Sequence, residues 1–567
     1  MRTKFGLIIA IGLVVALGAW APASAEPAPA VKAQPAPAKA AAVTKPAVSK
    51  PTGKLTYGTP MLATTENWFP WLEGRVGFAV MHAFYEALVA FDPRTGNFVP
   101  MLAERWQVED RGKRWRFFLR RGVQFHDGWG ELTADDVKYT VERYITDEKA
   151  IAASSAAFKT LLERFEIVSP YEFVLHLKEP SVTLLGHLTP TYFLIVSKRY
   201  IESAGDRKAM TKPVGTGPFK LVDHQRAQSV TLEAVVPHWR KTPGFQILEI
   251  RQIPDDAARL AMLRAREIDV MAVPFKFKRE LQAAGVGFLR LKSAALYHIH
   301  LGGQVLPTRK TFDPQVPWVG DPTDPVSVER ARKVRRALNL AVDKQAIIDS
   351  VFEGEGIRLS APFLPPDSEF VPQGQTPYPY DPAQARRLLA EAGYAQGFAR
   401  EIEMHLMPWP GRAEMVDVGE AVAGFWERNL GLKVKRTPID FATWAPRVNL
   451  PRNTAWRSVA QGYNPPPLAE PAISMATWLL STGARNTVAE TQELDKLYAA
   501  IIAEPDRARR VQLYRQLWQR FHAEYYAVPI AAVPALYAYN PKVVANWPMP
   551  PGDVYATGFE HAVPAGK

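Results

Sequence analysis

The sequence predicts an α/β protein, and three observations support that prediction. Segments with alternating apolar and polar residues, typical of half-buried strands, lie between segments with apolar residues at three- and four-residue spacing, typical of helices. The part that follows Lys54 has about 510 residues, more than a single core usually holds, so two or three packed units are expected. No short internal repeat is visible, which argues against a solenoid or a propeller.

The N-terminus has the layout of a secretory signal peptide, residues 1–25. Arg2 and Lys4 precede an apolar run from Phe5 to Trp20, and the small residues Ala23-Ser24-Ala25 follow it. A membrane anchor is the alternative, but the run is shorter than the ~20 residues that a spanning helix needs. The sequence therefore predicts export, with cleavage after Ala25.

Residues 26–53 are almost only Ala, Pro, Lys and Val, a composition that predicts a disordered or polyproline-like tether. The chain has no cysteine, which excludes thiol catalysis, Cys-ligated zinc and a lipid attached to an N-terminal Cys. An exported protein without a lipid anchor needs a closed compartment to stay near its cell. A Gram-negative periplasm is therefore the expected location.

The formal net charge is +12, and removal of Arg2 and Lys4 with the signal peptide leaves +10. Basic and acidic residues are interspersed over the globular part, so general solubility explains the charge. An anionic ligand or surface is the weaker alternative. Nucleic acid is not an expected partner, because the chain has no basic stripe.

Local patterns predict individual elements. In Trp115-Arg116-Phe117-Phe118-Leu119-Arg120 the apolar residues at 115, 117 and 119 share one face, as in a half-buried strand. Turn signals bound a short predicted strand at residues 123–125, and Thr133 ahead of two aspartates predicts the start of a helix. Further helices are predicted over residues 328–342, 382–392 and 505–523, and further strands over residues 230–235, 246–253 and 297–301.

Several sequence blocks follow one another in a distinctive order. They are Tyr85-Glu86-Ala87-Leu88-Val89, the segments 92–96, 100–106 and 119–137, Gly215-Thr216-Gly217-Pro218-Phe219, Ile253-Pro254-Asp255-Asp256, and the segments 334–343 and 380–394. In this order the chain resembles the family 5 extracellular solute-binding proteins, which include oligopeptide-, dipeptide- and nickel-binding receptors of ABC importers. The resemblance covers about residue 55 to the C-terminus. Most block residues have a structural interpretation, with the glycines expected to permit turns at positive φ.

The resemblance implies a two-lobed periplasmic-binding-protein fold of type II, of the large class with an extra domain, with the ligand cleft between the lobes. Lobe I is expected to comprise residues 54–80, 206–272 and 525–567, its extra domain residues 81–205, and lobe II residues 273–524. The chain would cross between the lobes near residues 272–275 and return near 525–532. Closure of the lobes around a ligand is a hinge motion.

The same resemblance implies the partners. They are a small-molecule or peptide-like ligand and the membrane permease subunits of an ABC importer. The receptor itself is expected to be a monomer without a cofactor, a metal or a stable membrane anchor.

Three aromatic stretches are candidates for the ligand cleft, because aromatic rings stack on or enclose a ligand. They are residues 64–71, residues 405–409, and residues 461–465 with the segment that leads on to Trp478. Ordinary hydrophobic packing is the alternative interpretation of the first stretch. The predicted ligand-binding residues are Asn67, Trp68, Trp71, Trp409, Tyr463, Asn464 and Trp478.

The third stretch departs from the family pattern. Peptide-binding relatives tend to carry an Asp just before this tyrosine, and its carboxylate pairs with the free α-amine of the peptide. Here Gly462 precedes Tyr463, and no acid occurs between Trp456 and Leu468. A buried ammonium without a counter-charge is unfavourable, so the sequence predicts a ligand that is not held through a free α-amine in the usual way. If the alignment is shifted, Glu470 is the substitute acid.

Two alternatives to an organic-solute receptor remain. His298 and His300 alternate along a predicted strand and so face one side, where two imidazoles can bind a transition metal or a metal chelate. Two polar residues that line a sheet or a cleft are the simpler interpretation. The other alternative is a periplasmic chaperone or signalling protein that reuses the scaffold. An enzyme is not expected, because the sequence lacks a phosphate-binding loop, a His-Glu-x-x-His motif and a Gly-x-Ser-x-Gly motif.

Overall fold

The structure is a computed structural model of the chain. It describes residues 50–92, 97–309, 312–409, 411–412, 414–440, 443–444, 459–464, 470–483, 489–549 and 556–566. The predicted signal peptide and most of the predicted tether lie outside these residues. The last residues of the tether segment already pair with the folded chain, since Thr52 N–H donates to Gly244 O at 3.0 Å and Gly53 O accepts from the Ile247 N–H at 3.1 Å.

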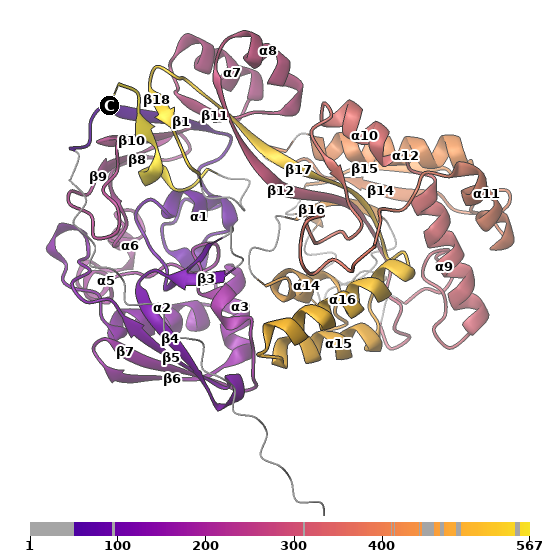
Figure 1. Cartoon of the computed structure of the whole chain (residues 1–567), viewed down its shortest axis with the longest axis horizontal. Coiled ribbons are helices and arrows are strands. Elements are labelled where there is room, and N and C mark those ends of the chain that lie inside the picture. The colour runs from indigo at the N-terminus through magenta and orange to yellow at the C-terminus, as the bar shows by residue number, and fades with distance from the viewer. Residues whose placement is uncertain are drawn as a thin grey trace, which may run out of the picture. The chain divides into compact units, whose positions relative to one another are not determined.

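The part of the chain before residue 286, called here the N-terminal part, mixes strands and short helices (Figure 1). Its strands are β1 (Lys54–Thr59), β2 (Val89–Asp92), β3 (Asn97–Pro100), β4 (Ala103–Glu109), β5 (Arg114–Leu119), β6 (Leu162–Ser169), β7 (Glu172–Leu177), β8 (Phe219–Gln225), β9 (Ser229–Ala234), β10 (Ile247–Gln252) and β11 (Val270–Ala272). Its helices are α1 (Arg75–Met81), α2 (Ala134–Thr146), α3 (Ala153–Leu161), α4 (Leu184–His187), α5 (Lys198–Ala204), α6 (Asp206–Ala209), α7 (Asp256–Ala265) and α8 (Lys278–Ala283).

The part between β12 (Gly287–Leu301) and β17 (Ala527–Tyr539), called here the C-terminal part, has longer helices. These are α9 (Pro325–Leu340), α10 (Lys344–Val351), α11 (Pro382–Glu391), α12 (Glu414–Leu430), α14 (Ala472–Trp478), α15 (Gln492–Ala503) and α16 (Arg507–Ala523). Its strands are β13 (Ile357–Arg358), β14 (Ile402–Leu406), β15 (Val434–Pro438) and β16 (Val459–Asn464). After β17 come β18 (Val544–Asn546) and β19 (Val563–Pro564).

One sheet runs through both parts. Within the described residues its order is β15-β14-β16-β12-β17-β11-β1-β10-β9-β8, with β13 pairing to β17. Strand β17 pairs with β11 through Val270↔Tyr539, whereas β12 pairs with β16 through Leu301↔Val459. The long antiparallel strands β12 and β17 are therefore the link between the N-terminal and C-terminal strands, as Figure 1 shows.

The link bends at β-bulges. The β12–β17 register shifts between Leu291 and Ala295, and Ser293 in that gap has a φ of 47°. A second shift lies between Tyr297 and His298. Because a bulge interrupts the ladder and bends its strand, the link changes direction where it passes from one part to the other.

A separate antiparallel sheet in the N-terminal part has the order β4-β5-β7-β6. The predicted alternation in β5 is confirmed, since Trp115, Phe117 and Leu119 are buried. Helix α2 begins as predicted after Thr133, whose backbone N–H donates to Asp136 Oδ2 at 3.0 Å in a capping box. Helix α11 likewise begins after Asp381, whose carboxylate accepts from the Gln384 N–H at 2.8 Å.

Three local predictions need correction. Residues 123–125 form no strand, and Gln124 makes a single bridge to Glu131. Helix α16 begins at Arg507 rather than at residue 505, because Asp506 caps it by accepting from the Arg509 N–H. The predicted strand at 297–301 is the end of the much longer β12.

The backbone conformation of the two glycines in the block at residues 215–217 also differs from the predicted one. Neither glycine has a positive φ. A Cβ on Gly215 would lie 1.9 Å from Phe84 O, and one on Gly217 would lie 2.6 Å from the Phe84 carbonyl carbon. These glycines are required because another backbone passes close by, whereas Gly122 and Gly393 do adopt positive φ.

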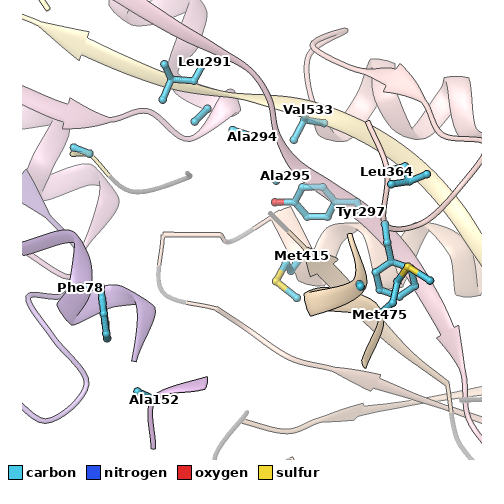
Figure 2. Close-up of a cluster of buried hydrophobic side chains, with 14 of the residues drawn as sticks. Phe78, Ala152, Leu291, Ala294, Ala295, Tyr297, Leu364, Met415, Met475 and Val533 are labelled. Atoms are coloured by element: carbon cyan, nitrogen blue, oxygen red, sulfur yellow. The ribbon is translucent and has the colours of Figure 1, made fainter. Parts of the chain in front are cut away.

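Buried apolar side chains from both parts belong to one contiguous cluster. Figure 2 shows part of it, with Phe78 and Ala152 from the N-terminal part and Met415 and Met475 from the C-terminal part, together with Tyr297 of β12. No helix within the described ranges is both long enough and apolar enough to cross a membrane.

Candidate functional site

Three of the segments that the sequence singles out leave the sheet at the ends of parallel strands. Strands β14 and β16 are parallel neighbours, with His405 paired to Ala460, so the chain leaves both at the same edge. β14 leads to Trp409, and β16 ends at Asn464. In open α/β sheets, ligands bind outside the carboxyl ends of the strands, so this edge is the candidate site.

The N-terminal part reaches the same edge. Strand β1 is parallel to β10 and β11, and the chain leaves its carboxyl end at Pro60. A Cβ on Gly411, two residues after Trp409, would lie 3.1 Å from Pro60 Cγ. The turn after β14 therefore contacts the loop after β1, and that loop leads directly to the first aromatic stretch.

Two carboxylates hold the loop of residues 64–67. The buried carboxylate of Glu73 accepts from the N–H groups of Thr64 at 3.0 Å and Thr65 at 2.8 Å, and from the Asn67 N–H at 3.3 Å. Glu66 has a φ of 53° and accepts from His224 Nε2 at 2.8 Å. Since several backbone donors converge on one carboxylate, these hydrogen bonds stabilise the conformation of the loop.

The two tryptophans predicted in this stretch are core residues in this structure. Trp68 and Trp71 are both 0% exposed. The Trp68 indole N–H donates to His224 Nδ1 at 3.3 Å, and the Trp71 indole N–H donates to Asp147 Oδ2 at 3.0 Å. Their polar atoms are thus satisfied within the N-terminal part, which matches the packing alternative. Asn67 is half-buried in the loop itself.

The turn after β14 carries a buried polar group that was not predicted from the sequence. Arg412, 8% exposed, forms a bridge with Trp409 and lies 3.4 Å from Glu414 Oε1 through its Nη1. Glu414 Oε1 also accepts from the Tyr297 hydroxyl at 2.7 Å. The sequence feature that indicates this group is an Arg and a Glu two residues apart in a turn that follows a strand. Trp409 is half-buried beside this group.

Strand β16 places Gly462 against the histidine pair. In the backbone register, Gly462 is paired with His298, and Tyr463 with Tyr297. A Cβ on Gly462 would lie 2.6 Å from His300 Nε2 and 3.0 Å from His298 Nε2. The position at which peptide-binding relatives tend to carry an acid therefore faces two buried imidazoles. The side chains of Tyr463, Asn464 and Trp478 lie outside the described residues.

The side chains of His298 and His300 are hydrogen-bonded to each other. Their Nε2 atoms are 2.8 Å apart, and the side chains are 0% and 2% exposed. His298 Nδ1 lies 3.2 Å from Leu296 O, and because a carbonyl only accepts, that nitrogen carries the proton. His298 Nε2 then accepts from the His300 Nε2–H. Burial lowers the pKa of His298 to about 3.

This pairing bears on the metal alternative. A metal ligand offers a lone pair, whereas the His300 Nε2 lone pair is replaced by a proton in the hydrogen bond. Over the ranges that the structure describes, no group of three or more His, Cys, Asp or Glu side chains is arranged to hold a metal ion.

The substitute acid, Glu470, is already paired. It is 5% exposed and accepts from Arg510 Nε at 3.2 Å and from the hydroxyl of Tyr514. Burial raises the pKa of its carboxyl, with Arg510 acting in the opposite direction. Its negative charge is thus neutralised inside the C-terminal part.

Comparison with known proteins identifies the family to which this architecture belongs. The family described as "Bacterial extracellular solute-binding proteins, family 5 Middle" matches residues 97–484, more than half of the chain. Heme-binding protein A of Haemophilus influenzae is 28% identical over 83% of this chain and 86% of its own length. The dipeptide-binding protein of Escherichia coli is 26% identical over 79% of this chain and 83% of its own.

Solved structures share the fold. NikA from Brucella suis in complex with Fe(III)-EDTA superposes with a TM-score of 0.74 at 21% identity, covering 90% of this chain and 100% of that one. A dipeptide-binding protein from Pseudoalteromonas in complex with Met-Leu gives a TM-score of 0.73 at 21% identity, covering 90% of this chain and 100% of that one. The predicted α/β fold of the two-lobed periplasmic binding proteins is confirmed.

Proposed function

Because the chain belongs to the family 5 bacterial extracellular solute-binding proteins, we propose that it captures a peptide-like or other small organic solute in the periplasm and delivers it to the membrane subunits of an ABC importer. The members compared above are binding proteins rather than enzymes. The observation that supports this proposal best is the meeting of the loop after β1 with the turn after β14, where Gly411 contacts Pro60. A ligand at that edge touches both parts of the chain.

The domain assignment is part of the proposal. Lobe I comprises residues 54–80, 206–272 and 525–567, with an extra domain at residues 81–205, and lobe II comprises residues 273–524. The bulged strands β12 and β17 are the hinge. Export through the signal peptide at residues 1–25 and a monomeric receptor complete the proposal.

We assign ligand contact to Asn67, Trp409, Tyr463, Asn464 and Trp478, and a supporting role to Trp68 and Trp71. The reason is burial, since both of these tryptophans are enclosed in lobe I with their N–H groups already bonded. Half-buried Trp409 lies at the strand edge that faces Pro60. An aromatic wall there provides apolar contact, and closure excludes water.

The ligand is not held through a carboxylate that pairs with a free α-ammonium. Gly462 offers no carboxylate, and a side chain at that position meets the imidazoles of His298 and His300. The next acid, Glu470, is neutralised by Arg510. The ligand class is therefore an N-blocked peptide-like compound or another organic solute without an essential amine.

Two measurements test the proposal. Native mass spectrometry of the protein purified from its own periplasm should reveal a bound small molecule. Calorimetry should then compare Met-Leu with N-acetyl-Met-Leu. We expect blocking of the amine to change the affinity less than about threefold, whereas loss of a buried charge pair costs about 2–5 kcal/mol, roughly 30-fold or more. Tight binding of Met-Leu that disappears on acetylation contradicts the assignment of the ligand class.

A further inference from the structure

Outside the candidate site, a second contact joins the two parts of the chain. The N–H of Val182, in the loop that follows β7, donates to Ile502 O at 2.9 Å. Ile502 lies in the last turn of α15, whose carbonyls have no partner within the helix. The loop is held from its own side, because Ser181 Oγ accepts from the Thr183 N–H at 3.3 Å and lies 2.8 Å from Thr183 Oγ1. A helix end of the C-terminal part is thus capped by the N-terminal part.

The adjacent packing contact depends on a glycine. A Cβ on Gly186, in α4, would lie only 2.2 Å from Ile473 Cδ1 of α14, and its other neighbours are Ile473 Cγ1 at 3.6 Å and Phe98 Cζ at 3.9 Å. The half-buried Ile473 side chain therefore fills the space that a side chain at position 186 would occupy. Figure 1 shows α3 facing α14 and α15 in the same region.

The backbone does not explain this glycine. Gly186 does not have a positive φ, so a larger residue fits its conformation. Within its own part, the neighbour near the added carbon is Phe98 at an ordinary contact distance. Among the residues that the structure describes, the severe overlap is with Ile473, which belongs to the other part and is present only when the two parts are close together.

We propose that Gly186 and Ile473, with the Val182–Ile502 hydrogen bond beside them, form a latch that sets the population of the closed state and hence retention of the solute. This inference depends on the proposed function for its biological meaning, but its geometry does not. The latch residues are distinct from the residues that we assign to ligand contact. Affinity is therefore adjustable at positions that do not touch the solute, because a ligand that selects the closed form binds more weakly when that form is less populated.

Two opposite substitutions and their combination isolate the latch. Ile473→Ala removes three carbons from the contact, and Gly186→Val adds three carbons that overlap Ile473. Each should decrease the closed-to-open ratio by about fivefold to tenfold, the effect expected for a partly buried three-carbon change. Together they should recover most of that loss, because the valine occupies the space that the isoleucine leaves. Such a coupling is a property of residues in contact.

The readout uses the absence of cysteine in the chain. Lys159 on α3 and Lys496 on α15 are exposed, one on each part, and serve as Lys159→Cys and Lys496→Cys attachment sites for spin labels. Pulsed electron resonance on the full mature chain then gives the distance distribution between the parts. Ile167→Ala, an exposed isoleucine in β6, is the matched control and should leave the distribution unchanged.

The expected result is a short-distance population that falls in each single variant and returns in the double variant, with thermal unfolding midpoints within a few degrees of the parent. The absence of a short-distance population in the parent, identical distributions in all four proteins, or a double variant as open as the sum of the singles would each overturn the latch. The distances are measured without added solute. Failure to find a bound solute therefore contradicts the proposed function and leaves the latch result intact.

Discussion

Replacing Gly462 with alanine tests the close packing of β16 on the histidine pair. The added methyl would lie 2.6 Å from His300 Nε2 and 2.8 Å from His300 Cδ2, well inside normal contact. Both rings are almost fully buried, and Phe363 lies against them with centroids 5.1 and 6.1 Å away, so the rings have little room to move. Overpacking of this kind costs about 1–3 kcal/mol of unfolding free energy.

Urea unfolding followed by tryptophan fluorescence measures that loss. Gly424→Ala is the matched control, because Gly424 lies within α12 and its new methyl meets only the flexible end of Arg428. That control should gain about 0.5–1 kcal/mol from helix propensity. Adding His300→Ala to Gly462→Ala should recover stability relative to the sum of the two single changes. If Gly462→Ala unfolds at the same urea concentration as the parent, β16 does not pack on the imidazoles as described.

Three further predictions concern buried groups. Burial lowers the pKa of His187 to about 4, below its value of about 6.5 in the unfolded chain. The unfolding free energy should therefore fall by up to about 1.4 kcal/mol per pH unit as the pH drops from 6.5 to 4. In urea titrations, His187→Gln should reduce that pH dependence by the equivalent of about one proton. Burial lowers the pKa of Lys344 to about 7. Between pH 7 and 10 the Lys344 amine is therefore protonated in the unfolded chain but neutral in the folded one, and the stability of the parent should rise with pH. Lys344→Met should flatten that gain and stabilise the protein at pH 7 by roughly 1–3 kcal/mol in urea unfolding. Trp71→Phe should cost about 1–2 kcal/mol of unfolding free energy, because Asp147 Oδ2 loses the indole donor while Oδ1 keeps the Lys149 N–H. Solute affinity measured by calorimetry should stay within about twofold, and a large loss of affinity would return Trp71 to the ligand site.

Features that depend on near neighbours in the chain could be predicted from the sequence. The helix that follows Thr133 and the helix that follows Asp381 each begin with a hydrogen bond between a side chain and a backbone group three residues away. The alternation in β5 rests on one buried face. The close approach at Gly215 was missed, because the backbone that passes it, at Phe84, is far away in the sequence.

The linking strands show why local sequence patterns did not predict them, although the family resemblance implied a return between the lobes near residues 525–532, where β17 begins. Strand β17 is buried along almost its whole length, so it has no polar face and no alternation. It also contains Pro529 and Pro534, which normally argue against a central strand because proline donates no hydrogen bond. Pro534 falls in the register gap between Val533 and Ala535, and Pro529 borders the second gap. The bulges that bend the link also accommodate residues that a regular ladder would reject.

The candidate site shows the same limit at the level of single side chains. The sequence located the strand end that carries Trp409 and the aromatic stretch that holds Tyr463, but it did not determine which residues face the edge and which face the core. That choice follows from register, since a shift of one residue reverses every side chain. The observed register sends Gly462 toward His298 and places Tyr463 opposite Tyr297, whose hydroxyl bonds to Glu414 beside Arg412. A missing carboxylate at position 462 is therefore also a packing requirement, because the imidazole pair occupies the space that an aspartate would need.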